Sequence, residues 1–456
     1  MDDKKTWYSR AVKALNLCLV TLPLAYGWFF YYAEGLHLPH PMRLGAALTF
    51  VFFVFYFLIG HKIYDAFRIS FFRVSELCLR QFLAYLIDDT CLFIGLWYLS
   101  GKYLSGKFPN IVPALYILGV QLVFSVLWCI LAKKWYIANY PPNDTALIYS
   151  GDSSFDETIL RYGRESRFHI VGKYSAEECL QDMSVIDRVQ IVFLDMPQSS
   201  QRNEITAYCM SKGITCFLIP TVHDAIMSSA IEAHMMYTPM LKVSRSYASP
   251  EYAFLKRFFD IVLSGALIVI FSPLMAAVAL LVRRDGGPAL FKQARLTKDG
   301  KIFTLIKFRS MIVDAEKDGK ARLSTGENDD RITPVGRKIR ACRLDEFPQL
   351  FNIFRGDMSF VGPRPERPEI AAQYEENLPE FRLRLQVKAG LTGLAQIYGQ
   401  YNTPPEEKLK LDLFYIANAS IWEDMRLFFA TFSILFEKDS TEGVEKGKTT
   451  AMDQNK

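Results

Sequence analysis

Long apolar segments constrain this chain more than any other feature, and four of them fall in its first third. They lie near residues 14–32, 44–59, 82–99 and 111–132. Each approaches the roughly 20 residues with which a helix crosses the apolar core of a bilayer. Hydrophobic residues make up 50% of the 456-residue chain, which is high for a soluble protein. The sequence therefore predicts a four-helix transmembrane domain over residues 1–138.

The basic residues around these segments predict their orientation, because cytoplasmic loops carry an excess of Lys and Arg. The N-terminus is basic, and the first loop contains only Arg43. Lys133 and Lys134 follow the fourth segment. The second loop contains four basic residues, namely Lys62, Arg68, Arg73 and Arg80. We therefore expect a cytoplasmic N-terminus and a return of the chain to the cytoplasm near Trp135.

A fifth apolar segment, residues 258–282, is long enough to span a membrane but has basic residues at both ends. These flanking pairs are Lys256-Arg257 and Arg283-Arg284. By the positive-inside rule, both ends belong on the cytoplasmic side. Pro273 removes a helix hydrogen bond near the middle, and the Ser272 hydroxyl can bond to the carbonyl that is freed. We therefore predict a re-entrant helix over residues 254–284 that bends at Ser272 and Pro273, with a kinked spanning helix as the alternative.

Short β-branched and aromatic runs alternate with helical stretches over residues 139–245. This alternation predicts a parallel sheet in a small Rossmann-like α/β domain, with one of its helices near residues 156–162. A single glycine, Gly151, follows the first strand, so the dinucleotide fingerprint G-x-G-x-x-G is absent. A structural or regulatory module is favoured over a cofactor domain. The polar tail over residues 439–456 is predicted to be disordered.

Composition narrows the chemistry that the remaining segment, residues 250–438, can perform. The net charge of +5 is small and spread along the chain, so we expect no nucleic acid as a partner. All six histidines precede residue 250, and Cys342 is the single cysteine of the C-terminal third. A Ser-His-Asp triad, a Cys-His pair or a histidine zinc site is poorly supported there. Carboxylates, Lys and Arg remain, and this set suits phosphoryl transfer.

The densest group of charged residues is the segment 337–350. Pro348 fits the first turn of a helix, and Gly356 can end it. One apolar face is predicted at helical spacing from Phe347, Leu350, Phe351 and Phe354. Asp345 and Glu346 then lie at a helix N-terminus, where backbone N–H groups favour anions such as phosphate. Acidic residues at a helix start are also ordinary caps, so both interpretations stay open for this segment alone.

Three cations outside the dense segment are candidates for the same site, to which that segment adds cations of its own. Lys307 and Arg309 share one face of a predicted strand. Arg364 lies in a rigid Gly-Pro-Arg-Pro turn. Unpaired charges resist burial, so cations that converge on the acidic pair would form an anion site. The sequence does not show whether they converge.

Residues 254–436 resemble the catalytic domain of the monotopic phosphoglycosyl transferases, the bacterial sugar transferase family. The matching stretches, in order, are KRFFD (256–260), SP (272–273), RDGGP (284–288), KFRSM (307–311), RIT (331–333), LDE (344–346), PQL (348–350), GDMS (356–359), VGPRP (361–365) and GLTGL (390–394). The four N-terminal segments and the middle α/β unit are similar to the long polyprenyl-phosphate hexose-1-phosphate transferases. The expected fold is thus a membrane α plus α/β protein, with a mixed α/β catalytic domain over residues 250–438 that contains the re-entrant helix.

The resemblance implies a role for each candidate residue. Asp345 would be the nucleophile that attacks the sugar-linked phosphate of a UDP-hexose, with galactose or glucose as the expected sugar. Glu346 would act as a base or would organise metal and phosphate, and Asp345 and Glu346 would hold Mg²⁺. Undecaprenyl phosphate would be the acceptor, and UMP the released product. The phosphate- and substrate-binding residues would be Lys307, Arg309, Gln349, Arg340 and Arg364.

The resemblance also implies a location, and it leaves several points open. We expect a multi-pass protein of the bacterial inner membrane with its middle and catalytic domains in the cytoplasm, in contact with the lipid bilayer. A homodimer through the middle unit is a hypothesis. Where the family often has tryptophan after Gly393-Leu394, this chain has Ala395-Gln396, which bears on the choice of sugar. The last apolar stretch, residues 411–436, is an interfacial helix or a plain core helix.

Two functions of other classes compete with this hypothesis. A glycosyltransferase that moves the sugar without its phosphate would use an Asp-x-Asp motif, to which Asp329-Asp330 is the nearest match, with the wrong spacing. It would release UDP in place of UMP. A non-enzymatic membrane scaffold or sensor would use the charged clusters to bind lipid headgroups or a partner. Such a protein would keep its function after loss of Asp345.

Overall fold

The computed structural model describes residues 3–32, 41–99, 109–151, 167–235, 237–245, 249–284, 286–313, 331–399 and 403–434. The chain forms two compact units, Met1–Ile219 and Pro220–Lys456. The helix expected near residues 156–162, the polar tail and Asp329-Asp330 lie outside the described residues.

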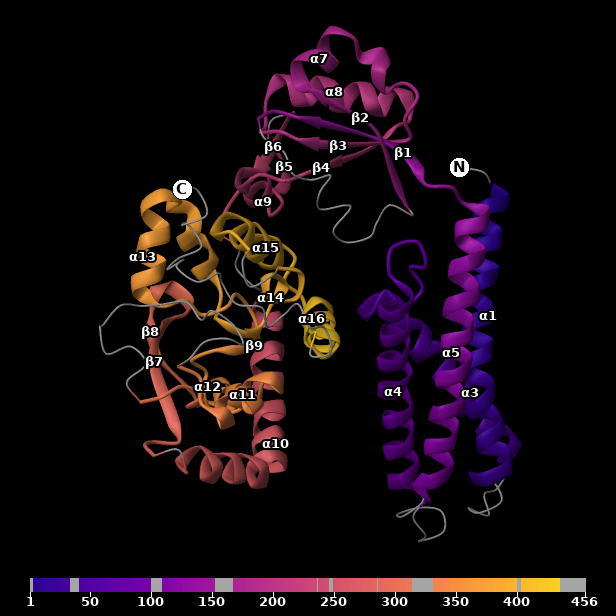
Figure 1. Cartoon of the computed structure of the whole chain (residues 1–456), viewed down its shortest axis with the longest axis vertical. Coiled ribbons are helices and arrows are strands. Elements are labelled where there is room, and N and C mark those ends of the chain that lie inside the picture. The colour runs from indigo at the N-terminus through magenta and orange to yellow at the C-terminus, as the bar shows by residue number, and fades with distance from the viewer. Residues whose placement is uncertain are drawn as a thin grey trace. The chain divides into compact units, whose positions relative to one another are not determined.

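The first unit begins with a bundle of long helices (Figure 1). Its members are α1 (Asp3–Gly27) with η1 (Trp28–Tyr32), α3 (Pro41–Leu58) with η2 (Ile59–Ile63), α4 (Val74–Leu99) and α5 (Ile111–Asn139). Over the described residues, the helices long and apolar enough to cross a membrane are Arg10–Tyr32, Gly45–Ile63, Ile111–Asn139 and Pro250–Arg283. The third expected span is helical, as α4, but is not among these four. Its adjacent carboxyl residues, Asp88 and Asp89, lower its mean hydropathy.

Polar side chains link the helices inside this bundle. The Asn16 amide nitrogen donates to Gln81 Oε1 at 3.1 Å, and the Ser125 hydroxyl donates to the same oxygen at 2.6 Å. The Tyr56 hydroxyl donates to Asn16 Oδ1 at 2.9 Å. Because an apolar environment offers no water, such bonds satisfy groups that would otherwise be costly to bury. They connect α1, α3, α4 and α5.

A four-stranded parallel sheet follows the bundle in the same unit. Its strands are β1 (Asn143–Tyr149), β2 (Phe168–Ser175), β3 (Ile191–Asp195) and β4 (Thr215–Leu218), in the order β2-β1-β3-β4. Two helices, α7 (Ala176–Gln181) and α8 (Ser200–Lys212), pack on it around the buried side chains of Ile148, Leu194 and Ile205. The predicted parallel α/β region is confirmed, while its Rossmann-like character stays a prediction.

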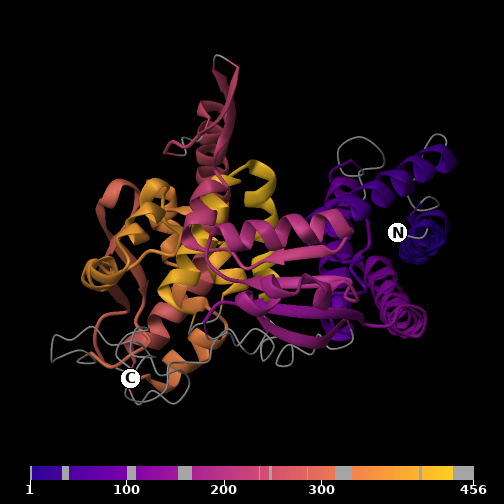
Figure 2. The ribbon, with the colours of Figure 1, turned by 90° about the horizontal axis from the view of Figure 1, so that it is seen from above.

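The second unit begins with a short helix and a hairpin that we expected within the middle domain. The helix α9 (Val222–Met227) packs on the C-terminal unit, where Ala225 belongs to the main core. The hairpin consists of β5 (Ile231–Met235) and β6 (Thr238–Lys242), and Figure 2 shows it standing clear of the neighbouring elements. Because Ala225 is buried in this core, residues 220–227 belong to the C-terminal unit.

The rest of the second unit combines short strand pairs with short helices. One antiparallel pair is β7 (Leu290–Leu296) with β8 (Ile302–Phe308), and one parallel pair is β9 (Ser359–Val361) with β10 (Gly390–Thr392). The helices are α10 (Pro250–Arg283), α11 (Pro334–Ala341), α12 (Gln349–Arg355), α13 (Pro368–Asn377), α14 (Leu394–Tyr398), α15 (Pro405–Ala417) and α16 (Ile421–Ile434). Shorter 3-10 turns are η5 (Lys298–Gly300), η7 (Leu344–Glu346) and η8 (Pro379–Gln386). The main core includes Ile353, Met358, Phe381 and Leu409.

The long helix α10 corresponds to the segment predicted to be re-entrant. It is hydrogen-bonded to other elements of the second unit near both of its ends. Pro273 lies inside the helix, and the Ser272 hydroxyl donates to the Val269 carbonyl at 2.8 Å. Figure 1 shows α10 changing direction sharply towards its C-terminal end. Near its start, Asp260 accepts from the Phe360 amide of β9 at 3.1 Å. Many of its apolar side chains are exposed, including Val269 at 73%.

The last apolar stretch forms two helices rather than one. In α15 the side chains of Leu409, Leu413 and Ile416 are buried in the main core, which agrees with a core helix. In α16 Leu427 is buried, whereas Trp422 is 65% exposed. An interfacial role for α16 stays a prediction.

Candidate active site

The acidic pair lies on a tight turn between two short helices. α11 is capped by Thr333, whose hydroxyl accepts from the Gly336 amide at 2.9 Å. Arg343 adopts a left-handed backbone conformation with φ of 51° and turns the chain into η7, which carries Asp345 and Glu346. Pro348 then caps α12, which confirms the predicted helix start.

The predicted apolar face of α12 is only partly correct. Leu350 and Ile353 are buried in the main core, whereas Phe351 and Phe354 are 40% and 47% exposed. The helix has seven residues and apolar side chains on two sides, so one side fills the core and the other faces outward. Gly356 ends the helix with a φ of 97°, as expected, because this left-handed conformation favours glycine.

Asp345 has the properties of a reactive carboxylate. Its side chain is buried, with 9% of the residue exposed. Burial and the neighbouring Glu346 raise the pKa of Asp345 to about 6, while Lys307 and Arg340 oppose that rise. The carboxylate is therefore ionised near neutral pH, yet has few water molecules around it. A poorly solvated anion held between cations suits nucleophilic attack on a phosphate.

Lys307 lies on β8, and Asp345 is among the charged groups that act on its ammonium group. Burial lowers the pKa of Lys307 to about 8; Asp345 counteracts this, while Arg295, Arg340 and Arg364 add to it. The Lys307 Nζ lies 5.2 Å from the centre of the Phe291 ring. Within the described residues it has no hydrogen bond or ion pair, so an incoming anion can bind it.

Glu346 and Arg364 connect the turn to the Gly-Pro-Arg-Pro loop. The Arg364 Nη2 lies 3.7 Å from Glu346 Oε1, and the Arg343 Nη1 lies 3.8 Å from Glu346 Oε2. The Arg364 side chain is 52% exposed, so it reaches solvent as well as the site. A Cβ at Gly362 would collide with the Lys388 carbonyl and with Gly390, so the loop requires glycine there.

Two further candidates, Arg309 and Gln349, are placed differently. The Arg309 guanidinium is buried and donates to four backbone carbonyls, those of Val282, Gly286, Pro288 and Met311, at 2.9–3.2 Å. These bonds hold the C-terminal end of α10 next to the end of β8, so the contacts of Arg309 in the structure are structural. Phosphate binding by Arg309 stays a prediction. Gln349 is the first residue of α12 and is buried, with 6% exposed.

Sequence reasoning missed a buried charge network behind the Arg364 loop. Arg384 donates from Nε to Asp412 Oδ2 at 2.9 Å and from Nη2 to the Arg364 carbonyl at 3.0 Å. Arg295 donates from Nη1 to the Pro365 carbonyl at 3.0 Å, and Glu366 lies 3.8 Å from Arg384 Nη1. Arg384 and Asp412 are buried, with 3% and 1% of their side chains exposed. These residues span 118 positions, so no local spacing marks them.

Comparisons with known proteins decide the family. The bacterial sugar transferase family profile matches residues 251–438, which contain all the candidate residues. The UDP-glucose:undecaprenyl-phosphate glucose-1-phosphate transferase of Escherichia coli is 30% identical over 329 residues, covering 66% of this chain and 70% of the relative. This chain belongs to the bacterial sugar transferase family.

Two further relatives have higher identity over shorter matched segments. The undecaprenyl-phosphate galactose phosphotransferase of Salmonella typhimurium is 37% identical over 213 residues, which cover 44% of each chain. The UDP-N-acetylgalactosamine-undecaprenyl-phosphate N-acetylgalactosaminephosphotransferase of Aeromonas hydrophila is 40% identical over 187 residues, covering 40% of this chain and 44% of the relative. The matched segment thus spans less than half the length of these two relatives.

The carboxylates of this sugar transferase fit one kind of metal site. In the described part of the chain, no group of three or more His, Cys, Asp or Glu side chains could hold a metal ion. Mg²⁺ commonly takes one or two protein carboxylates and completes its shell with substrate phosphates and water. Asp345 and Glu346 fit that arrangement, in which the ion binds together with a diphosphate substrate.

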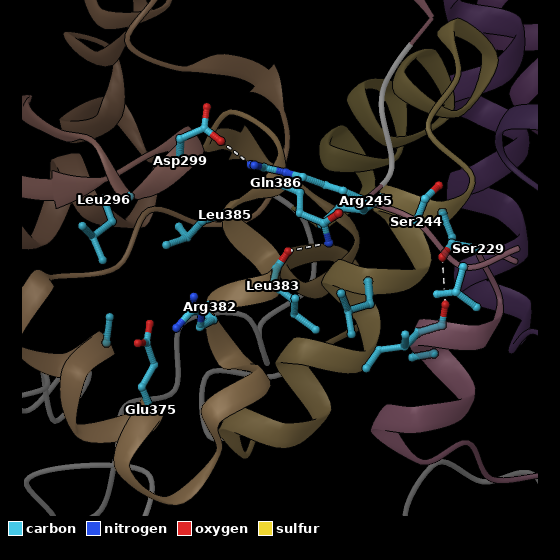
Figure 3. A pocket seen from close by; sticks show the side chains of 18 of the residues that line it. Ser229, Ser244, Arg245, Leu296, Asp299, Glu375, Arg382, Leu383, Leu385 and Gln386 are labelled. Atoms are coloured by element: carbon cyan, nitrogen blue, oxygen red, sulfur yellow. Dashed lines mark hydrogen bonds and ion pairs between the residues drawn. The ribbon is translucent and has the colours of Figure 1, made fainter.

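A cavity of about 750 Å³ lies elsewhere in the second unit (Figure 3). It is lined by α9, α13, η8, α15 and the segment around Arg245, which pairs with Asp299 at its edge. Figure 3 also shows Gln386 bonded to the Leu383 carbonyl within it. Asp345, Lys307 and Arg364 are not among its lining residues, so this cavity of the sugar transferase is separate from the candidate site.

Proposed function

We propose that this sugar transferase moves a sugar 1-phosphate from a UDP-sugar to undecaprenyl phosphate. The observation that carries the proposal is the buried Asp345 carboxylate beside the Lys307 ammonium, which has no ion pair among the described residues, within the segment that matches the family. The names of the three relatives above all contain undecaprenyl phosphate, which we take as the acceptor. Their sugars are galactose, N-acetylgalactosamine and glucose, so this chain's donor is sought among those UDP-sugars.

The first half of the reaction forms a covalent intermediate. An Asp345 carboxylate oxygen attacks the sugar-linked phosphorus of the UDP-sugar. The bond from that phosphorus to the bridging oxygen breaks, UMP leaves with its electron pair, and the phosphosugar stays on Asp345. Lys307, Arg340 and Arg364 offset the negative charge on the phosphate oxygens. Gln349, buried at the start of α12, positions the substrate.

The second half returns the enzyme to its starting state. A phosphate oxygen of undecaprenyl phosphate attacks the same phosphorus, and the bond to Asp345 breaks. The product is a sugar linked to the lipid through a diphosphate, and Asp345 is again a carboxylate. Two displacements through one carboxylate divide a single difficult transfer into two steps. Glu346 keeps Arg364 close to the reacting group.

Mg²⁺ is the cofactor that the acidic pair supports, held by Asp345, Glu346 and the substrate diphosphate. When bound, it neutralises charge on phosphate oxygens.

We further propose that α10 is re-entrant and that the catalytic unit faces the cytoplasm. The N-terminal end of α10 is bonded to the unit, since Arg257 donates to the Ile353 and Phe354 carbonyls at 2.7 and 2.8 Å. Its C-terminal end is bonded to the same unit through Arg309 and the Val282 carbonyl. A helix that spanned the bilayer would separate these ends across it. Together with the basic pairs at both ends, these contacts support entry and exit on one side.

This arrangement has a direct topological test. Single cysteines introduced as Glu251→Cys and Arg284→Cys, in a chain without its native cysteines, should both react with an impermeant maleimide from the cytoplasmic face only. Reaction of the two positions from opposite faces would show a spanning helix. The arrangement places the inner-membrane lipid carrier and a cytoplasmic donor at the same surface, as the first membrane step of surface polysaccharide synthesis requires.

The products of turnover test the proposed reaction. The full chain in nanodiscs is mixed with Mg²⁺, undecaprenyl phosphate and each UDP-sugar in turn. We expect UMP release with at least one sugar, and its loss in Asp345→Asn. Release of UDP would show a glycosyltransferase instead. A protein that releases no nucleotide from any donor and keeps its cellular role after Asp345→Asn would be a scaffold.

A further inference from the structure

One lysine of the catalytic unit carries an ammonium group for which the fold supplies no partner. Lys408 lies in the first turn of α15 and is half-buried. Within the described residues it makes no side-chain hydrogen bond or ion pair. A half-buried cation without a partner is costly, because it loses hydration and gains no opposite charge in return. Burial accordingly lowers the pKa of Lys408, although Glu366 opposes the shift.

Lys410, on the same helix, is by contrast paired with carboxylates. The Lys410 Nζ lies 2.7 Å from Glu407 Oε1 and 3.0 Å from Glu406 Oε1. These two pairs raise the pKa of Lys410, although burial opposes them. Lys410 is therefore neutralised within its own helix, whereas Lys408 is not.

Helix geometry and the buried network place Lys408 beside the Arg364 loop. Asp412 follows Lys408 by four residues and lies on the same face of α15. Asp412 is bonded to Arg384, and Arg384 donates to the Arg364 carbonyl at 3.0 Å. The charged groups around Lys408 are accordingly Glu366, Arg384, Arg364 and Asp412.

Cations and carboxylates meet at this place. The cationic side chains are those of Arg295, Arg364, Arg384 and Lys408, and the carboxylates are those of Glu346, Glu366 and Asp412. Among the described residues, one buried donor, Arg384 Nη1, has no hydrogen bond, and its approach to Glu366 is 3.8 Å. Lys408 likewise has no acceptor there, and the oxygens of a phosphate group, which carries a charge of about −1.5 to −2 near neutral pH, would supply one.

We propose that Lys408 and Arg364 form a second phosphate subsite, apart from the subsite of Lys307 and Arg340 beside Asp345. The inference rests on the proposed function, because that reaction needs a place for a phosphate other than the one under attack. Arg364 is the charged neighbour that Lys307 and Lys408 share, so it lies where the two subsites meet. The network of Arg384, Asp412 and Arg295 positions the loop that carries Arg364.

The phosphate in this subsite comes from one of two substrates. It belongs either to the nucleotide side of the donor diphosphate or to undecaprenyl phosphate in the second half-reaction. Both present the same chemistry to Lys408. Measuring the two half-reactions separately distinguishes these two sources, because the first half-reaction needs no lipid.

The test compares Lys408→Met with Lys410→Met as a matched control and with Lys408→Arg as the conservative variant. UMP release in the absence of lipid is measured against UDP-sugar concentration, and steady-state turnover is measured against undecaprenyl phosphate. Loss of one charged hydrogen bond should raise the KM for one substrate by about 10- to 100-fold. The kcat and the midpoint of thermal unfolding should change little. Lys410→Met should match the wild type, and Lys408→Arg should recover most of the affinity.

Each outcome decides the inference. A higher KM for the UDP-sugar alone assigns the nucleotide phosphate, and a higher KM for the lipid alone assigns the lipid phosphate. Wild-type KM values in Lys408→Met would overturn the subsite, as would equal losses in Lys408→Met and Lys410→Met. If the wild type releases no nucleotide, the proposed function has failed. The subsite is then judged by binding of inorganic pyrophosphate, which Lys408→Met should weaken and Lys410→Met should not.

Discussion

Each compact unit contains two adjacent acidic residues of which one is buried, and the surroundings of the two pairs are opposite. Asp88 and Asp89 lie on α4 in the helix bundle, and Asp88 is 2% exposed. Asp345 and Glu346 lie on η7 in the catalytic unit. Over the described residues, no ion pair reaches Asp88 or Asp89, and their neighbours are neutral groups such as Gln121, whose Nε2 lies 3.5 Å from Asp89 Oδ1. Asp345 instead has Lys307 and Arg340 beside it.

The difference shows that adjacent carboxyl groups do not by themselves make a reactive site. A charged group inside a membrane bundle is expensive, and the neutral neighbours of Asp88 and Asp89 limit this pair to hydrogen bonding between helices, as with Gln121. The cations around Asp345 keep it ionised despite burial. The proposed function therefore depends on the convergence of cations on the acid pair.

The largest expected effect is the loss of activity when the acidic pair of the catalytic unit is changed. Asp345→Asn should lower the rate of UMP release by at least about 10³-fold, because an amide cannot form the acyl phosphate. The protein should retain its thermal stability, because the amide keeps the shape of the side chain. Single-turnover UMP release in nanodiscs measures the effect. Residual activity within tenfold of the wild type would show that Asp345 is not the nucleophile.

The second prediction concerns the buried pair that supports the Arg364 loop. Asp412→Asn leaves the Arg384 guanidinium without its carboxylate, which should destabilise the catalytic unit by about 3–5 kcal/mol. The midpoint of thermal unfolding should fall by roughly 10 °C. Glu407→Gln is the matched control on the same helix, because Glu407 is 50% exposed and its pair with Lys410 contributes little. Equal midpoints for the two variants would contradict the buried-pair interpretation.

The third prediction uses the pH dependence of kcat/KM. Asp345 must be deprotonated, so the rate should fall about tenfold per pH unit below its pKa of about 6. Lys307 must be protonated, so the rate should also fall above its pKa of about 8. In Lys307→Met the alkaline limb should disappear and the acid limb should move to higher pH, because Lys307 holds the pKa of Asp345 down. A profile that is flat from pH 5 to about pH 7 would exclude Asp345 as the group that titrates.

The smallest effect is expected in the bundle. Asp88→Asn and Asp89→Asn replace a carboxyl group by an amide among neutral neighbours, so stability should change by less than about 1 kcal/mol. Turnover should stay at the wild-type level. A loss of activity comparable to that of Asp345→Asn would show that the bundle pair takes part in function and would break the comparison.

Local patterns predicted much of the fold. The long apolar helices follow from segment length, and the four parallel strands follow from β-branched runs of the right length. The position of Asp345 just before a helix followed from Pro348 and Gly356, whose backbone preferences act over a few residues. The approach of Lys307 and Arg340 to Asp345, and of Arg364 to Glu346, agrees with the motifs of the family, although no spacing along the chain shows it.

Long-range features could not be predicted. The contacts of Arg309 are one example. Only the fold shows that its guanidinium donates to a backbone carbonyl at the end of α10. The Arg384–Asp412 pair and the unpaired Lys408 depend on how α15 packs against the Arg364 loop, which residue spacing does not encode. The assignment of α9 to the catalytic unit depends in the same way on the burial of Ala225 in a core built from distant segments.

The most direct test of the account is mass spectrometry of the protein after incubation with Mg²⁺ and its UDP-sugar in the absence of undecaprenyl phosphate. The account predicts one UMP released per protein and a phosphosugar attached to the peptide that contains Asp345, which disappears when the lipid is added. Asp345→Asn should show neither. UMP release that requires the lipid, with no adduct on Asp345, would contradict the covalent mechanism.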